Sequence, residues 1–353
     1  MQYLTDDVRI TGMQEVIAPE NLMVQLPISS ESSTLVFQTR AVVNDIINRR
    51  DGRLLAIVGP CSIHDPQAAL EYADRLKAAA DEYRDTLLIV MRVYFEKPRT
   101  IIGWKGLIND PLLDNSFKIN EGLATARQLL LDINAKGLTA GTEYLDPITP
   151  QYVADLVSWG AIGARTTESQ VHRQLASGLS CAVGFKNSTD GSIQIAADAI
   201  RSSAHSHIFL SVTKQGRSAI FSTAGNADCH IILRGGNNGP NYSADHIRET
   251  AELLEAAGVA TGIMVDMSHA NSQKDHTRQM LVCDDLCGQI AGGEDRIVGV
   301  MVESNLAAGR QDIVNGMEGL TYGQSVTDAC IGWEDTERVL ADLAAAVGQR
   351  MAR

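Results

Sequence analysis

The sequence predicts an α/β protein and, within that class, a (β/α)8 TIM barrel. From residue 54 onward, short apolar runs of strand length alternate with segments of helical periodicity. Eight such runs can be counted, and they fit into the roughly 250 residues that eight βα units usually occupy. Alternation of this kind is typical of a parallel sheet, and eight units suit a closed barrel.

The eight expected strands are rich in aliphatic and β-branched residues, and amphipathic or alanine- and leucine-rich segments separate them. One of these helical segments ends at Lys136 and Gly137, as helices often do. The strands are expected at residues 54–60, 87–93, 139–144, 161–166, 182–187, 230–235, 262–269 and 297–304.

Two segments do not belong to the eight units. Residues 1–45 precede the first of them and form an N-terminal extension to a barrel over residues 46–353. Residues 207–225 contain two short β runs around Lys214, Gln215 and Gly216, which predicts a β-hairpin inserted before the sixth barrel strand. The sequence contains no evident internal repeat, so one barrel with two additions is the simplest organisation.

Composition narrows the classes of partner. The chain has 353 residues, 44% of them hydrophobic, which is enough for a large core. A net charge of -13 and a pI near 5.0 disfavour nonspecific binding to nucleic acid or anionic membranes. Neither a membrane-spanning run nor a leader pattern is predicted, so we expect a cytoplasmic protein. Six scattered cysteines without CxxC pairs favour reduced thiols.

Reactive side chains stand at the carboxyl ends of the predicted strands, where a barrel of this type has its active site. A Ser or Asn would meet solvent equally well there, so this choice of residue types predicts a functional rim. In chain order the residues are Cys61, Arg92 with Lys97, Glu143, Arg165, Lys186, Arg234, His269 and Glu303.

One group at this rim is cationic. Several positive charges in one mouth of an acidic protein are costly without anions, and arginine and lysine bind phosphate and carboxylate well. The alternative is ion pairing with the abundant Asp and Glu, and a lone strand-end lysine could also serve a Schiff-base aldolase. We expect a ligand with both phosphate and carboxylate at Arg92, Lys97, Arg99, Arg165, Lys186 and Arg234.

The second group can bind metal. Cys61, His269 and Glu303 are joined by Asp328, from the loop beyond the eighth strand. A thiolate, an imidazole and two carboxylates can hold one divalent ion per subunit and leave a position for substrate; Mn, Fe, Co and Zn all fit. Singly, a buried Cys is more often a small apolar residue and a His a satisfied polar group. Their convergence on one rim favours the metal site.

These residues belong to longer motifs, and with them the chain resembles the microbial class I 3-deoxy-D-arabino-heptulosonate 7-phosphate (DAHP) synthases along essentially its whole length. The resemblance rests on Gly59-Pro-Cys-Ser-Ile-His-Asp65, Met91-Arg92, Glu96-Lys-Pro-Arg-Thr100, Gly103-Trp-Lys-Gly-Leu-Ile-Asn-Asp110, Gly160-Ala-Ile-Gly-Ala-Arg-Thr-Thr-Glu-Ser169, Gly184-Phe-Lys-Asn187, Arg234-Gly-Gly236, Asp266-Met-Ser-His269, Val302-Glu-Ser304 and Thr327-Asp-Ala-Cys330.

The resemblance implies a role for each rim residue. It gives the metal ligands as Cys61, His269, Glu303 and Asp328. Phosphoenolpyruvate would bind by its phosphate at Arg165 and Arg234, and by its carboxylate at Arg92, Lys97 and Lys186. Glu143 and Ala164 also match substrate positions, and Arg99 and Thr100 match the erythrose 4-phosphate site. The related octulosonate phosphate synthases differ at Lys97-Pro-Arg-Thr100, so this stretch favours the four-carbon aldehyde.

The implied reaction is an aldol-like, metal-dependent condensation that begins aromatic amino-acid biosynthesis. C3 of phosphoenolpyruvate attacks the metal-polarised aldehyde, water adds at C2, and phosphate leaves by C–O cleavage. Lys97 would donate a proton to the new alkoxide, so Lys97, Cys61 and His269 are the expected catalytic residues.

The resemblance also gives the two additions a regulatory and oligomeric role, with a homodimer or homotetramer expected. Ser211, where tyrosine-sensitive relatives tend to carry Gly, favours phenylalanine as feedback inhibitor over tyrosine or tryptophan. Pro147 and Phe221 depart from the phenylalanine-sensitive pattern, and Ser188 departs from the family's usual Gly. The expected effector positions are Asp6, Asp7, Pro150, Gln151, Leu175, Leu179, Ser180, Phe209 and Ser211.

Two alternatives remain at this point. A sister synthase could condense phosphoenolpyruvate with another sugar phosphate. A catalytically silent barrel could instead sense amino acids or dock to a chorismate mutase, although every expected metal ligand is retained.

Overall fold

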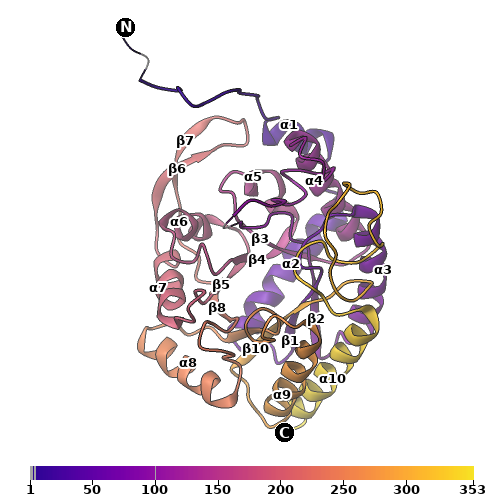
Figure 1. Cartoon of the computed structure of the whole chain (residues 1–353). Helices are drawn as coiled ribbons and strands as arrows, with labels where there is room; N and C mark the ends of the chain where they lie inside the picture. Colours follow the sequence, from indigo (N-terminus) through magenta and orange to yellow (C-terminus); the bar gives the residue numbers. More distant parts are fainter. Residues whose placement is uncertain (1–2, 4, 100) are drawn as a thin grey trace.

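Eight parallel strands close into a barrel in the computed structural model, which describes residues 3, 5–99 and 101–353. The order around the barrel is β1-β10-β9-β8-β5-β4-β3-β2, and helices surround it (Figure 1). The predicted fold class is confirmed. The barrel strands are β1 (Leu54–Gly59), β2 (Leu87–Arg92), β3 (Ala140–Glu143), β4 (Val157–Ile162), β5 (Ala182–Lys186), β8 (Cys229–Leu233), β9 (Ile263–Asp266) and β10 (Ile297–Glu303).

The outer helices follow the strands along the chain. Their starts carry ordinary signals: the Asp65 carboxylate accepts hydrogen bonds from the backbone N–H groups of Gln67 and Ala68, and Pro66 occupies the first turn. No helix in the described ranges is both long and apolar enough to cross a membrane. The helices are α3 (Pro66–Glu82), α4 (Ile119–Ala135), α5 (Pro150–Val153), η1 (Ala154–Leu156), α6 (Gln170–Gly178), α7 (Ile193–Ser203), α8 (Ala244–Ala256), η2 (His276–Arg278), α9 (Gln279–Ala291) and α10 (Trp333–Met351).

Two strands differ most from the bounds that the sequence predicts. Strand β4 covers Val157–Ile162 rather than residues 161–166, because the chain turns at Gly163, whose carbonyl accepts hydrogen bonds from the N–H groups of Thr166 and Thr167. Arg165 therefore lies in a loop. Strand β9 ends at Asp266, so His269 also stands beyond its strand, with a positive φ of 59°.

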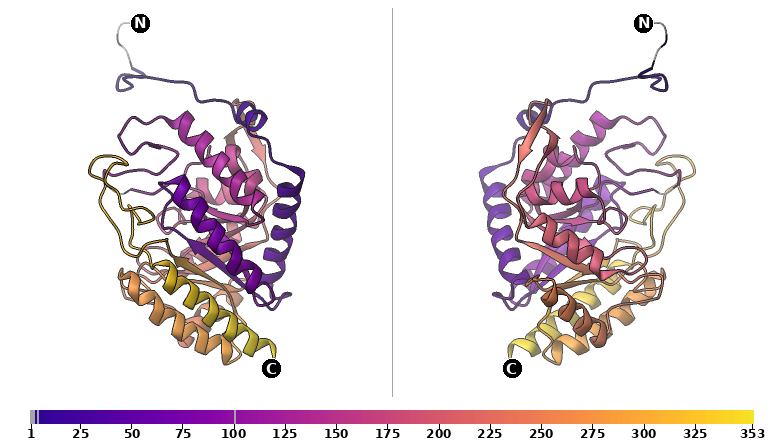
Figure 2. Two further views of the ribbon diagram at one scale, coloured as in Figure 1. Left: turned by 90° about the vertical axis from the view of Figure 1, so that its right-hand side faces the viewer. Right: turned by 90° about the vertical axis from the view of Figure 1, so that its left-hand side faces the viewer.

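The extension contributes α1 (Pro19–Gln25) and α2 (Ser30–Ile47), and the boundary expected after residue 45 falls inside α2. Helix α2 lies across one end of the barrel, opposite the loops at the other end (Figure 2). Its Val43, Ile46 and Ile47 pack with residues from the barrel interior. The Arg40 guanidinium donates to the carbonyl of Val157, where β4 begins. Helix α2 thus covers the amino ends of the strands, and the functional rim is the opposite end.

The predicted hairpin is present as β6 (Ile208–Val212) and β7 (Ser218–Ser222), a separate antiparallel sheet. Its turn contains Gly216 at a φ of 74°, a value that favours glycine. The backbone N–H of Glu20 donates to the carbonyl of Lys214, so the hairpin contacts the start of α1. Residues 5–16 are exposed and extend away from the body of the molecule (Figures 1 and 2).

A polar pair lies within the barrel. The Trp159 indole N–H donates to Nε2 of His230 at 3.2 Å, and both side chains are fully buried. Because Nε2 accepts this bond, the imidazole must be neutral. Burial lowers the pKa of His230 to about 4.

This low pKa predicts a pH-dependent stability. The unfolded chain, with a His pKa near 6.5, binds the proton more readily, so the contribution is complete above pH 6.5 and is lost as pH falls toward 4. Relative to a His230→Gln variant, the protein should lose about 2 kcal/mol of unfolding free energy between pH 7 and pH 5. Urea unfolding at both pH values measures this, and equal losses in both proteins would contradict it.

Candidate active site and metal centre

One cavity at the carboxyl ends of the strands collects the expected substrate residues, apart from Thr100, which lies outside the described residues. Arg99 stands at its exposed edge, where its Nε donates to the carbonyl of Trp104 at 2.8 Å. The cavity is lined by Arg92, Lys97, Pro98, Arg99, Glu143, Gly163, Ala164, Arg165, Lys186, Thr189, Arg234, His269 and Asp328. Cationic and metal-ligating side chains therefore face one space.

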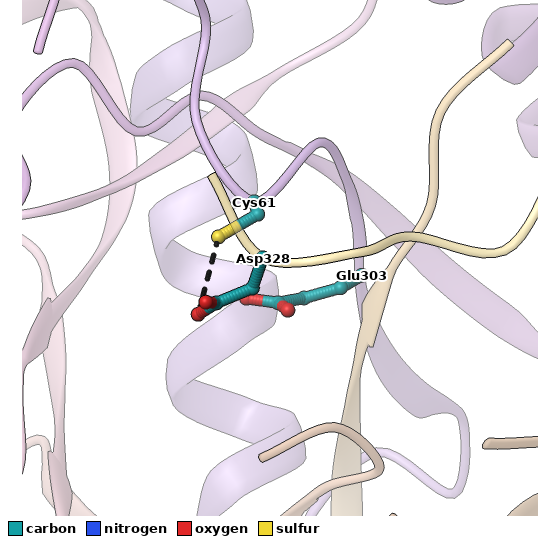
Figure 3. Close-up of side chains that lie close together, drawn as sticks. All are labelled: Cys61, Glu303 and Asp328. Carbon is teal, nitrogen blue, oxygen red and sulfur yellow. Dashed lines mark hydrogen bonds between the residues drawn. The ribbon is translucent and has the colours of Figure 1, made fainter. Parts of the chain in front are cut away.

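The expected metal ligands converge in this cavity. One ligand atom each from Cys61, Glu303 and Asp328 lies within 4.8 Å of the other two (Figure 3). Nε2 of His269 lies 3.9 Å from a Glu303 carboxylate oxygen, so the fourth expected ligand lies beside Glu303 but outside the group of three. One sulfur, one nitrogen and two carboxylate donors suit a transition ion such as Mn, Fe, Co or Zn.

A carboxylate behind His269 sets its orientation. Nδ1 of His269 lies 3.0 Å from Asp266 Oδ2 and 2.6 Å from the Ser268 hydroxyl, which leaves Nε2 directed toward the metal ligands. Asp266 is fully buried and also accepts a hydrogen bond from Lys186 Nζ at 2.8 Å. Burial opposes its ionisation, yet the Lys186 charge and His269 hold the pKa of Asp266 well below its usual value. Sequence reasoning assigned Asp266 no role, although a metal-bound histidine usually has a carboxylate, carbonyl or water as partner of its other ring nitrogen.

Lys97 lies against the thiol ligand. Its Nζ is 3.0 Å from the sulfur of Cys61 and 3.3 Å from the Cys61 carbonyl oxygen. Burial raises the pKa of Cys61 and Glu303 adds to the rise, whereas the Lys97 charge opposes it. At Asp328 burial also disfavours the charged form, but Lys97 and His269 keep its pKa below the usual value. A bound divalent cation would favour the thiolate.

The guanidinium of Arg92 forms hydrogen bonds with other residues at this end of the barrel. Its Nη2 donates to a Glu303 carboxylate oxygen at 2.9 Å and to the Cys61 carbonyl at 3.2 Å. Its Nε donates to the carbonyl of Pro60 at 3.0 Å, and its guanidinium stacks over the Tyr94 ring at 3.7 Å. Arg92 thus contacts two of the expected metal ligands as well as facing the cavity.

Arg234, directly after β8, and Arg165, in the loop after β4, form fewer hydrogen bonds with the described residues than Arg92 does. Arg234 Nε is buried, and within the described part of the chain no hydrogen-bond partner accepts from it. Burial lowers the pKa of Arg234, and the nearby Arg165 charge adds to this effect. The Arg165 guanidinium donates to the carbonyl of Pro98 at 3.2 Å. An anion between the two arginines would relieve both the desolvation and the repulsion.

Glu143 occupies the space that a side chain at position 163 would need. A Cβ at Gly163 would lie 2.3 Å from a Glu143 carboxylate oxygen, so any larger residue would displace this buried carboxylate. Gly163 was not singled out from the sequence, because only the folded chain brings the end of β3 against the β4 loop.

A second cavity, of about 650 Å³, lies between the hairpin, α5 and α6. Seven of the expected effector positions line it: Pro150, Gln151, Leu175, Leu179, Ser180, Phe209 and Ser211, together with Pro147 and Phe221. The structure places Asp6 and Asp7 in the exposed N-terminal tail, not in the cavity wall. Lys214 Nζ donates to the carbonyl of Gln151, which ties the hairpin to α5.

The chain was compared with known proteins and solved structures. Residues 25–341 match the model of the DAHP synthetase I family. The Phe-sensitive phospho-2-dehydro-3-deoxyheptonate aldolase of Escherichia coli K12 is 60% identical over 350 residues, 99% of each chain. The Trp-sensitive enzyme of the same strain is 52% identical over 346 residues, 98% of this chain and 99% of the relative.

A solved structure agrees in fold. The phospho-2-dehydro-3-deoxyheptonate aldolase of Francisella tularensis SCHU S4 superposes with a TM-score of 0.95 at 53% identity, covering 97% of this chain and 99% of that one. The family expected from the motifs is thereby confirmed. The chain belongs to the DAHP synthetase I family, as a class I, microbial-type 3-deoxy-D-arabino-heptulosonate 7-phosphate synthase.

Proposed function

We propose that phosphoenolpyruvate and erythrose 4-phosphate condense in the rim cavity, with one divalent metal ion held by Cys61, His269, Glu303 and Asp328. One observation carries the proposal: the three clustered ligand atoms lie beside a cavity lined by arginine and lysine side chains. Metal ligands by themselves occur in many classes of enzyme, and clustered cationic side chains by themselves can bind many different anions. Their combination suits a reaction between two phosphorylated substrates at a Lewis acid.

The positions of the cations support a binding mode for phosphoenolpyruvate. The unpartnered Arg234 Nε and the nearby Arg165 can together hold its phosphate. Lys186 at the end of β5 and Lys97 in the loop after β2 face the cavity and can hold its carboxylate, and Arg92 at the end of β2 adds positive charge. In this binding mode the carboxylate would lie on the side of Lys97, whose Nζ is 3.0 Å from the Cys61 sulfur.

The aldehyde would then bind nearer the mouth, where Arg99 is exposed and can reach the phosphate of erythrose 4-phosphate. When bound, the metal would act as a Lewis acid on the aldehyde oxygen. Lys97 lies 3.0 Å from the Cys61 sulfur, so its ammonium can donate a proton to the alkoxide oxygen formed beside the ligands.

The hairpin cavity is the proposed feedback site, with phenylalanine as effector. It is lined by Phe209 and Phe221 from opposite strands of the hairpin, whose rings lie 6.2 Å apart and provide an apolar wall for an aromatic side chain. Ser211 faces the cavity where more room would be needed for a phenolic hydroxyl. The 60% identity to a relative described as Phe-sensitive supports this choice.

A homo-oligomer is part of the proposal. Ile208, Leu210 and Ile220 are 72%, 81% and 72% exposed on the outer face of the hairpin, an apolar surface that a second copy of the chain would cover. The exposed tail with Asp6 and Asp7 extends away from its own body, so these carboxylates could reach an effector cavity of a neighbouring copy.

The proposed reaction is tested by phosphoenolpyruvate consumption with erythrose 4-phosphate. Chelator-treated protein should be inactive and should recover when Mn²⁺ is added, because Lewis-acid activation requires the ion. Phenylalanine should suppress turnover at lower concentration than tyrosine or tryptophan. Activity only with a longer sugar phosphate, or none with any metal, would contradict the assignment of the rim.

A substitution at Lys97 can separate proton donation from the binding of phosphoenolpyruvate. Lys97→Met should reduce turnover by about a hundred- to ten-thousand-fold, the usual contribution of a general acid, while phosphoenolpyruvate binding is only weakened. Single-turnover assays and equilibrium titration measure the two effects. Lys118→Met, an exposed lysine outside the cavity, is the control. Near-normal turnover in Lys97→Met would overturn the proton-donor role.

The choice of effector at the hairpin cavity can be tested with a substitution at Ser211. Ser211→Gly should make room for a phenolic hydroxyl and strengthen inhibition by tyrosine about tenfold, with basal activity retained. Ser222→Gly, also in the hairpin and lining the same cavity, controls for the loss of strand stability caused by glycine. If both variants respond alike to tyrosine, Ser211 does not select the effector.

A further inference from the structure

The sheet is incomplete beside the metal ligand Glu303. Strand β10 continues to Glu303, but its pairing with β9 stops at Met301 and Asp266. Beyond that point β9 turns away: the N–H of Ser268 donates to the Asp266 side chain, and His269 takes a positive φ. This departure places His269 beside the other ligands. It also removes the strand that would have paired with the backbone of Glu303 on that edge.

The side chain of Gln279 takes the place of the missing strand. Its Nε2 donates to the Glu303 carbonyl at 2.9 Å, and its Oε1 accepts from the Glu303 N–H at 3.0 Å. Gln279 is fully buried and does not line the substrate cavity. Both ends of the amide are therefore used on the backbone of a single residue, so the N–H and C=O of Glu303 are both satisfied on the edge that β9 leaves.

The Glu303 carbonyl also accepts from the N–H of Ile331, at 3.0 Å. Ile331 follows Asp328 by three residues, so this bond connects Glu303 to the loop that carries the fourth ligand. On the other edge Glu303 pairs with Gly59, two residues before Cys61. The backbone of Glu303 is thus the point where the segments of three ligands meet, and Gln279 shares with Ile331 the edge that β9 leaves.

We propose that Gln279 is a positioning residue of the metal centre: its amide holds the backbone of Glu303 and thereby the place of the Glu303 carboxylate beside Cys61 and Asp328. The inference rests on the proposed metal ligands. Gln279 begins α9, directly after η2 and the loop that carries His269. The hydrogen bonds of Gln279 therefore make the geometry of Glu303 depend on the fold of that loop. Metal affinity, rather than substrate recognition, is the property it controls.

The test replaces Gln279 by Met, which has similar length but makes neither hydrogen bond. In metal-free protein, amide hydrogen exchange of the segment 297–305, followed by mass spectrometry, should become faster. Mn²⁺ alone, titrated into chelator-treated protein, should bind about 10- to 100-fold more weakly, as is usual when a partner of a metal ligand is lost. Saturating Mn²⁺ should restore most of the turnover.

The matched control is Gln289→Met. Gln289 lies on the same helix and donates to the carbonyl of Tyr242, away from the metal ligands, so this variant should keep normal exchange at 297–305 and normal Mn²⁺ affinity. Should Gln279→Met fail to fold, Gln279→Asn, one methylene shorter, is expected to change both measurements in the same direction. Unchanged exchange in the metal-free variant would overturn the proposal even if the metal assignment were itself mistaken. Faster exchange with unchanged Mn²⁺ affinity would overturn the link to the metal.

Discussion

The buried ion pair between Arg92 and Glu303 is the interaction on which the functional rim depends. The two groups are 2.9 Å apart and only 1% and 2% exposed, and neither charge could remain there alone. Lys186 and Asp266 form a second buried pair at 2.8 Å, from β5 and β9. Together they let the barrel hold charges near its core while Arg234, Arg165 and Lys97 still face the cavity. The site therefore combines internal neutralisation with an excess of positive charge at the mouth, which is what two phosphorylated substrates require.

The two ends of the barrel are built differently. At the amino ends of the strands, Val43, Ile46 and Ile47 of α2 close the interior with apolar contacts. At the carboxyl ends, residues two or three positions beyond the strands carry ligands on turns, as Cys61 and His269 do. A rigid apolar base allows polar groups at the other end to be held in costly positions, because the strands themselves cannot shift.

Helix α5 lies between the two cavities. Pro150 and Gln151 line the hairpin cavity, while the preceding Thr149 donates to the Glu96 carboxyl group at 2.9 Å. Glu96 is buried next to Lys97 in the chain, and burial raises its pKa to about 8, so it is largely protonated at neutral pH. Helix α5 thus links the hairpin cavity, through the hydrogen bond of Thr149, to the residue that precedes Lys97 of the substrate cavity. The extension and the hairpin are joined to this region through Lys214 and Glu20.

The sequence by itself determined the class of fold, the number of barrel strands and the inserted hairpin, and it predicted Cys61 and Glu303 as metal ligands, because strand length, helical periodicity and residue type at strand ends are local properties of the chain. Only the tertiary structure decided that β4 ends at Ile162 and that the Glu143 carboxylate lies against Gly163, where it leaves no room for a side chain. The tertiary structure likewise assigned Asp266 to His269 and Gln279 to the backbone of Glu303. Gln279 and Glu303 are 24 positions apart, and a hydrogen bond between such distant residues depends on where a strand leaves the sheet, which no local pattern records.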